Sequence, residues 1–263
     1  MISEKVELLG KGLYKDIPDV LTVKALPTVS ELEYVGSEDF DETMLTKIFP
    51  VCIEEDINFH QLLEVDYQWL CRCIRLISFG PYYTTNMLFC PECGQVKGEA
   101  RVNLKSIKCK PFPEGFVNNL TIKKDEFVDF NGDVVLHMPT IAEMLKADKD
   151  NIFSRPDGSS NTELARMCYM ISKIGTEKDI TPLTAKMFIE NNLSAADYII
   201  LKDKVTELTD YGLRAGGSTK CPRCGAEGAA FIALVDDRFL RPTVGDIKQG
   251  RDDRSIGSVE NLS

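Results

Sequence analysis

The chain has 263 residues, of which 43% are hydrophobic and 27% charged, so it can bury a core as one large domain or two smaller ones. Its formal net charge of −10 argues against the basic face that phosphate-binding proteins carry. No apolar run approaches the roughly 20 residues of a membrane span, and the N-terminus lacks the apolar core of a signal peptide, so we expect an intracellular protein.

Residues 1–80 are predicted to form an N-terminal part with one strand followed by helices. The strand is expected over Leu21–Leu26, and the helices from Thr28, over Asp41–Val51 and over Val65–Ser78. Glu31 stands three residues after Thr28, which is the spacing of a capping box. The last helix is expected to stop at the breaker pair Gly80-Pro81.

Short strands and then helices follow this N-terminal part. Residues 81–139 are expected to hold strands, over Tyr82–Phe89, Glu99–Leu104, Phe116–Ile122 and Val134–Met138. Residues 140–213 are expected to be a helical insertion, with helices over Thr140–Ala147, Thr162–Ile174, Thr184–Asn191 and, with Ser194 as N-cap, Ala195–Leu213. Residues 214–242 return to a strand over Ala229–Val235, and 243–263 form a polar tail that we expect to order on a partner.

Two near-identical Cys-Pro-X-Cys-Gly knuckles stand out in this pattern, at Cys90–Gly94 and Cys221–Gly225. Each places two thiolates on a tight turn, and the glycine supplies the positive φ that a chelating loop often needs. One pair cannot fill a tetrahedral zinc shell, but two pairs can. We therefore predict one structural Zn²⁺ per chain, with the ligands Cys90, Cys93, Cys221 and Cys224.

The two cysteine pairs are far apart, since residues 94–220 lie between them and a simple ribbon separates its halves by roughly 15–20 residues. The second knuckle is therefore expected to return to the first after a whole domain, with the metal as a staple that closes a long loop. We expect an intrachain site because the strands that frame the knuckles can pair locally. The predicted fold is α+β, a mainly helical protein with a strand-framed zinc ribbon of four cysteines. The first half of the ribbon is expected within 81–139 and the second half within 214–242, so the two halves flank the helical insertion.

No catalytic constellation emerges from the remaining residues, so an enzyme is not expected. Four cysteinates would leave no open coordination position on the zinc. The two histidines, His60 and His137, have no nucleophile linked to them by a motif. Asp66 begins a predicted helix, where its charge suits the helix dipole, and Arg72 and Arg75 follow on later turns. The other cysteines are expected to be buried structural thiols: Cys52, Cys71, Cys73, Cys109 and Cys168.

Four segments also carry a likeness to known proteins. They are Gly12–Tyr14 with Leu21–Thr28 and Glu31; Asp66–Arg75 with Ser78–Tyr83, running into the first knuckle; Leu193–Tyr198, leading to the second knuckle and Glu227; and Phe239–Pro242. In this order they resemble the baseplate hub assembly chaperone family of contractile-tailed bacteriophages and the T-even-type baseplate proteins grouped with it. The likeness spans residues 12–242, and residues 105–135 and the tail fall outside it.

This resemblance implies a non-enzymatic protein that binds other tail proteins, either as a baseplate component or as its assembly chaperone. It implies a place in the host cytoplasm during assembly, and in the tail if the protein stays in the particle. We expect no nucleic acid, membrane or small-molecule partner, and residues 140–213 to supply much of the protein-binding surface. The alternative is a zinc-ribbon nucleic-acid-binding or transcription-associated factor, and the charges that flank the knuckles are too mixed to favour it.

Overall fold

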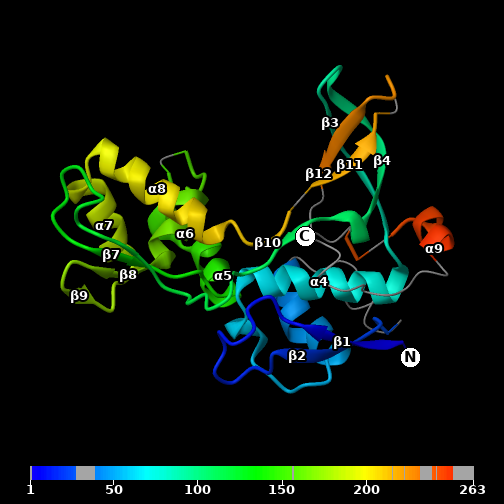
Figure 1. Ribbon diagram of the computed structural model, residues 1–263, viewed down its shortest axis with the longest axis horizontal. Helices are drawn as coiled ribbons and strands as arrows, with labels where there is room; N and C mark the ends of the chain where they lie inside the picture. Colours follow the sequence, from blue (N-terminus) through cyan, green and yellow to red (C-terminus); the bar gives the residue numbers. More distant parts are fainter. Residues whose placement is uncertain are drawn as a thin grey trace. The chain divides into compact units, whose positions relative to one another are not determined.

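The computed structural model describes residues 2–27, 39–155, 157–214, 216–221, 223–231, 239–240 and 242–250 (Figure 1). The predicted mixture of helix and strand is confirmed, with helix in excess. The chain divides into two compact units, a first unit within 1–59, 65–112 and 212–263 and a second unit within 60–64 and 113–211. In the part of the chain that is described, no helix is long and apolar enough to cross a membrane.

The first unit is organised around helix α4 (Glu64–Phe79), which confirms the helix predicted over Val65–Ser78. All residues of α4 from Val65 to Ile77 are buried except Gln68. A helix that is buried on every side lies inside a core, so α4 is the element around which the other elements of this unit pack.

The N-terminal elements of this unit are short. Strands β1 (Ser3–Glu7) and β2 (Val20–Lys24) pair antiparallel. The single helix predicted over Asp41–Val51 is instead α2 (Phe40–Thr43), a π-helical turn over Met44–Ile48 and α3 (Phe49–Cys52). Pro50 lies in the first turn of α3, and its missing N–H and its ring are incompatible with a regular helix there, so the turn before it widens. The helix expected from Thr28 falls outside the described residues.

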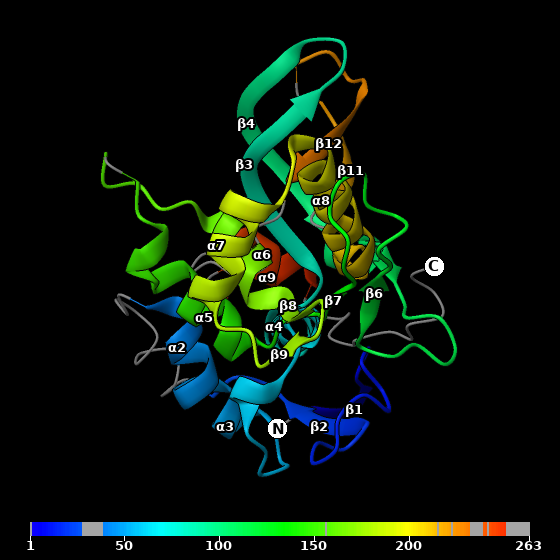
Figure 2. The same ribbon diagram turned by 90° about the vertical axis from the view of Figure 1, so that its left-hand side faces the viewer.

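A four-stranded antiparallel sheet, which we call the ribbon, carries both knuckles. Its strands are β3 (Tyr82–Cys90), β4 (Gly94–Asn103), β11 (Gly216–Lys220) and β12 (Glu227–Phe231), in the order β11-β12-β3-β4. Figures 1 and 2 both show the two hairpins side by side. The β11–β12 hairpin joins the β3–β4 hairpin where Ala229 of β12 is in register with Phe89 of β3. Strand pairing therefore brings segments far apart in the sequence together.

Two buried arginines of α4 hold the foot of the ribbon, which we define as the paired residues Tyr82 and Asn103. Arg75 donates to the carbonyls of Gly80 at 2.9 Å and Tyr82 at 2.5 Å, and Arg72 donates through Nε to the carbonyl of Leu104 at 3.2 Å. Both arginines are fully buried. Their role in the first unit is therefore to bind the backbone at both ends of the β3–β4 hairpin.

The segment after residue 243 contains a helix, α9 (Val244–Gly250), that the sequence pattern did not predict. Its Asp246 is 1% exposed, accepts a hydrogen bond from Thr84 Oγ1 at 2.8 Å and pairs with Arg101 Nε at 3.2 Å. We expected this tail to depend on a partner for its order, yet Val244–Gly250 packs on β3 of its own chain. The expectation fails because Asp246 of the tail finds its hydrogen-bond and ion-pair partners on the ribbon of its own chain.

The long segment of the second unit, residues 113–211, is inserted between β5 (Cys109–Lys110) and β10 (Gly212–Leu213), which pair antiparallel in the first unit. It holds a four-stranded antiparallel sheet of β6 (Leu120–Ile122), β7 (Val134–Leu136), β8 (Ile171–Ile174) and β9 (Glu177–Lys178) in that order. Its helices are α5 (Ile141–Lys149), α6 (Thr162–Met170), α7 (Pro182–Asn192) and α8 (Ala195–Thr209).

Two of the helix predictions in this unit end too late. The helix predicted over Thr162–Ile174 ends at Met170, because Ile171–Ile174 pair with β7 as the strand β8. The last helix ends at Thr209 instead of Leu213, and Gly212 beyond it has a φ of +85°. The N-cap prediction is confirmed, since the Ser194 side chain accepts a hydrogen bond from the backbone of Asp197.

Asp197 itself ties α8 to the loop that follows β6. Its carboxylate is fully buried and accepts hydrogen bonds from the backbone N–H groups of Val128 at 2.6 Å, Asp129 at 3.2 Å and Phe130 at 3.0 Å. A buried carboxylate is stable when such donors surround it, so Asp197 fixes this loop against the helix.

Candidate metal centre

The first knuckle is the turn of the β3–β4 hairpin. Cys90 is the last residue of β3 and is in register with Gly94, the first residue of β4. Gly94 has a φ of +76°, and a Cβ built there would meet nothing within 4 Å. Glycine is therefore required by the backbone conformation and not by crowding, as the sequence pattern predicts.

The second knuckle is the turn between β11 and β12. Lys220 is in register with Glu227, the Cys221 N–H donates to the carbonyl of Ala226 at 2.8 Å, and the N–H of Gly225 donates to the carbonyl of Cys221 at 2.9 Å. Because β12 pairs with β3, this turn lies at the same end of the ribbon as the first one. We call this end the tip.

The structure brings the four predicted cysteines together at the tip. The sulfur atoms of Cys90, Cys93, Cys221 and Cys224 all lie within 4.8 Å of one another. The Sγ atoms of Cys90 and Cys224 are 3.6 Å apart. Tetrahedral zinc with Zn–S bonds of about 2.3 Å holds its sulfurs roughly 3.8 Å apart, so the cluster has dimensions that fit a metal ion.

Hydrogen bonds at the second knuckle favour a thiolate. The backbone N–H of Cys224, and less strongly that of Arg223 at 3.4 Å, lower the pKa of the Cys221 thiol to about 7. The pKa of Cys93 is raised to about 12, chiefly by its hydrogen bond with the Cys224 thiol. Four thiols this close cannot all ionise without a cation between them, and a divalent cation supplies that charge.

Comparison of the sequence with protein families decides which family this chain is part of. A sequence model of the T4 bacteriophage base plate protein family matches residues 19–236. The chain belongs to this family. Comparison with curated proteins and with solved structures gave no match.

The match covers most of this baseplate-family protein. It includes both knuckles and the second unit from Pro113 to Tyr211, and it ends before α9. The resemblance seen in the sequence is therefore confirmed at the level of T4-type baseplate proteins.

The other cysteines of the baseplate-family protein are not part of the cluster. Cys52, Cys71, Cys73, Cys109 and Cys168 are all buried, as predicted. Burial raises the pKa of Cys52 to about 12, so its thiol stays neutral. His137 lies in the second unit with its Nε2 atom 3.2 Å from Glu143 Oε1, and neither histidine belongs to a metal-binding group among the described residues.

Proposed function

We propose that the protein binds other tail proteins in the baseplate without catalysing a reaction, as a baseplate hub component or as its assembly chaperone. The observation that carries this proposal is the match to the base plate protein family over residues 19–236. The division into two units supports it, because a ribbon-bearing unit and an inserted unit offer two separate surfaces.

We further propose that Cys90, Cys93, Cys221 and Cys224 bind one structural zinc ion. The sulfur distances and the thiolate-favouring turn of Cys221 support this ligand set. Zinc would supply the positive charge that lets four thiolates share the tip, and a filled tetrahedral shell leaves no position for an activated water. Since β5 and β10 already pair near the root of the insertion, the ion would act mainly on the tip of the ribbon.

For the partner-binding surface we propose the outward apolar residues of the second unit. Leu183 and Met187 lie one turn apart on α7 and are 52% and 55% exposed, and Ile199 on α8 is 67% exposed. Apolar side chains of this size at exposed helix positions are typical of interaction surfaces when they are grouped. Leu183→Ala with Met187→Ala should weaken partner binding, whereas Val20→Ala, at a 42% exposed position in the first unit, should not.

The experiment that tests the function is a pull-down of the tagged chain from infected cells, compared with the protein content of finished particles. Tail proteins in the pull-down together with the chain in particles would identify a structural component. Tail partners without the chain in particles would identify an assembly chaperone. Nucleic acid or polymerase without tail proteins would contradict the proposal and favour the alternative of a nucleic-acid-binding factor.

A further inference from the structure

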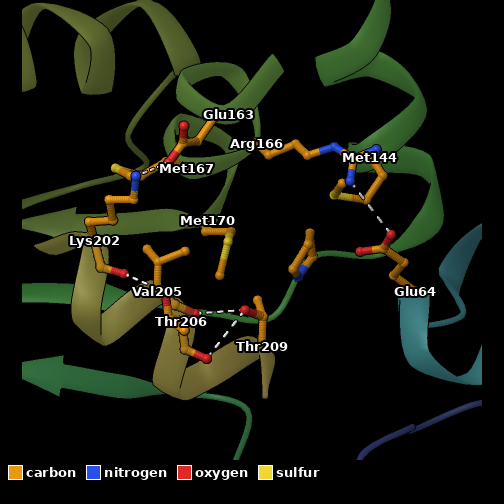
Figure 3. A pocket seen from close by; sticks show the side chains of 11 residues that line it. Glu64, Met144, Glu163, Arg166, Met167, Met170, Lys202, Val205, Thr206 and Thr209 are labelled. Atoms are coloured by element: carbon orange, nitrogen blue, oxygen red, sulfur yellow. Dashed lines mark hydrogen bonds and ion pairs between the residues drawn. The ribbon is translucent and has the colours of Figure 1, made fainter. Parts of the chain in front are cut away.

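The second unit contains a pocket of about 330 Å³ between helices α5, α6 and α8, shown in Figure 3. Its lining residues are Glu64, Pro139, Met144, Glu163, Arg166, Met167, Met170, Lys202, Val205, Thr206 and Thr209. A volume of this size is at the lower end of the range for ligand pockets, so it suits one or two side chains better than a large molecule.

The inner part of the pocket is apolar and adaptable. Met144, Met167 and Met170 form it together with Val205, and the three methionines are 2–3% exposed. Methionine is unbranched and can change rotamer at little cost, so a floor of methionines can reshape around an inserted side chain. Such a floor binds an apolar group by contact and not by directed hydrogen bonds.

The rim of the pocket is charged, and its lining has two carboxylates, Glu64 and Glu163, and two cations, Arg166 and Lys202. Lys202 Nζ pairs with Glu163 Oε1 at 2.6 Å on one side. On the other side Arg166 faces two carboxylates, Asp148 at 3.0 Å and Glu64 at 3.8 Å. Figure 3 shows the side chains of Glu163 and Glu64 at separate parts of the rim. Asp148, next to the lining, takes the closer contact with Arg166, so Glu64 is left with the longest of these ion pairs.

The second unit as a whole is acidic. Asp and Glu outnumber Lys and Arg in it by 18 to 11, so it carries most of the net charge of −10 of the chain. A field of this sign attracts cationic segments and repels acidic ones. The apolar floor of the pocket and the acidic charge of the unit therefore favour an occupant that combines an apolar side chain with a cation.

We propose that this pocket binds a segment of another tail protein that presents one large apolar side chain next to a lysine or arginine. The apolar side chain packs on Met144, Met167 and Met170, and the cation lies near Glu64 at the rim. This inference rests on the proposed function, since it specifies the chemistry of the partner segment that the baseplate-family protein binds.

The test uses the purified full-length chain and an array of overlapping short peptides that covers the other tail proteins of the same phage and this chain itself. We expect the bound peptides to share an apolar residue beside Lys or Arg. Thr206→Trp fills the mouth of the pocket from an exposed position of α8 and should weaken binding of these peptides by about tenfold or more. Glu207→Trp, exposed on another face of α8 and not among the lining residues, is the matched control and should bind as the natural chain does.

A second pair of variants tests the charge. Glu64→Gln should weaken peptide binding severalfold and reduce its dependence on salt, whereas Glu177→Gln, which removes the same charge at exposed strand β9, should have little effect. The proposal would be overturned if the chain bound acidic or purely polar peptides, bound only peptides from its own sequence, or bound none at all. Equal binding by Thr206→Trp and Glu207→Trp would also overturn it. If the Thr206→Trp chain still pulls down its tail proteins in full, the pocket is not the binding site, while the proposed baseplate function stands.

Discussion

Ala229 of β12 is in register with Phe89 of β3, although residues 113–211 of the second unit lie between them in the sequence. This single alignment sets the two knuckles at the same end of one sheet, because Phe89 immediately precedes Cys90. The four sulfur atoms come together through strand register as well as through any ion that they bind.

The first prediction concerns the metal. Cys224→Ser should reduce the zinc content of the purified protein from about one ion per chain to nearly none, because three thiolates leave the tetrahedral shell incomplete. Elemental analysis measures this directly. Cys168→Ser removes a thiol outside the cluster and should keep its zinc. Full zinc in Cys224→Ser would rule out the proposed ligand set.

Removal of the metal should affect the ribbon and not the core around α4. The tip holds the cysteines, while Arg72 and Arg75 bind the backbone at the foot. With a chelator we expect faster amide exchange at the two knuckles and unchanged exchange in α4. Loss of protection throughout α4 would show instead that the ion holds the whole first unit together.

The third prediction concerns pH and Asp66. Burial raises the pKa of this carboxyl to about 6, even though Leu9 N–H at 2.6 Å and Gly10 N–H at 3.0 Å donate to it. An acid whose pKa is higher in the folded state takes up a proton on folding at intermediate pH. Its contribution to the free energy of unfolding therefore increases as the pH falls through about 6 and levels off near about 4.

The raised pKa corresponds to about 3 kcal/mol of unfolding free energy at most. Denaturant unfolding of the natural chain and of Asp66→Asn over this pH range measures the effect, because the variant cannot titrate at this position. The difference between the two proteins should grow in favour of the natural chain as the pH falls. A constant difference would mean that Asp66 has an ordinary pKa in the fold.

The fourth prediction tests how α9 docks. A Cβ added at Gly80 would lie 2.6 Å from the carbonyl oxygen of Gly250, and Gly80 also has a φ of +85°. Gly12 has a similar φ of +75° with open space around it, so Gly12→Ala should cost only about 1–2 kcal/mol of backbone strain. Gly80→Ala should cost about 1–3 kcal/mol more and release α9 to amide exchange. Equal effects of the two substitutions would contradict the close packing of α9.

The fifth prediction concerns the loop that Asp197 holds. Asp197→Ala leaves the part-buried hydrogen bonds of the Val128, Asp129 and Phe130 N–H groups without their acceptor and should destabilise the second unit by about 1–3 kcal/mol. Asp203→Ala, at an exposed position of the same helix, should change stability by less than about 0.5 kcal/mol. Thermal unfolding of both variants, followed by amide exchange of α8, distinguishes these outcomes.

The parts of the fold that could be predicted depend on short-range chemistry. The knuckles, the buried helix α4 and the Ser194 cap each follow from neighbouring residues. By contrast, Ile171–Ile174 continue a helical pattern and become a strand only because β7 lies beside them. The partners of Asp66 are all distant in sequence, so no local pattern distinguishes this buried carboxylate from a solvated one. Asp197 and Asp246 each have a local partner three residues earlier, Ser194 and Thr243, but their partners across the fold are distant in sequence.

Lys110 and Gly212 face each other across the β5–β10 pair. Paired antiparallel residues have their Cα atoms about 4.5–5.5 Å apart, a gap that a short turn can bridge. The long segment of the second unit, residues 113–211, thus leaves and re-enters the first unit at one point of its backbone, while the short segment 60–64 crosses elsewhere. Residues 113–211 could be excised and replaced by a tight turn, or exchanged for an unrelated domain, without separating β5 from β10. This junction is therefore a place where the inserted segment can change while strands β3, β4, β11 and β12 keep their pairing.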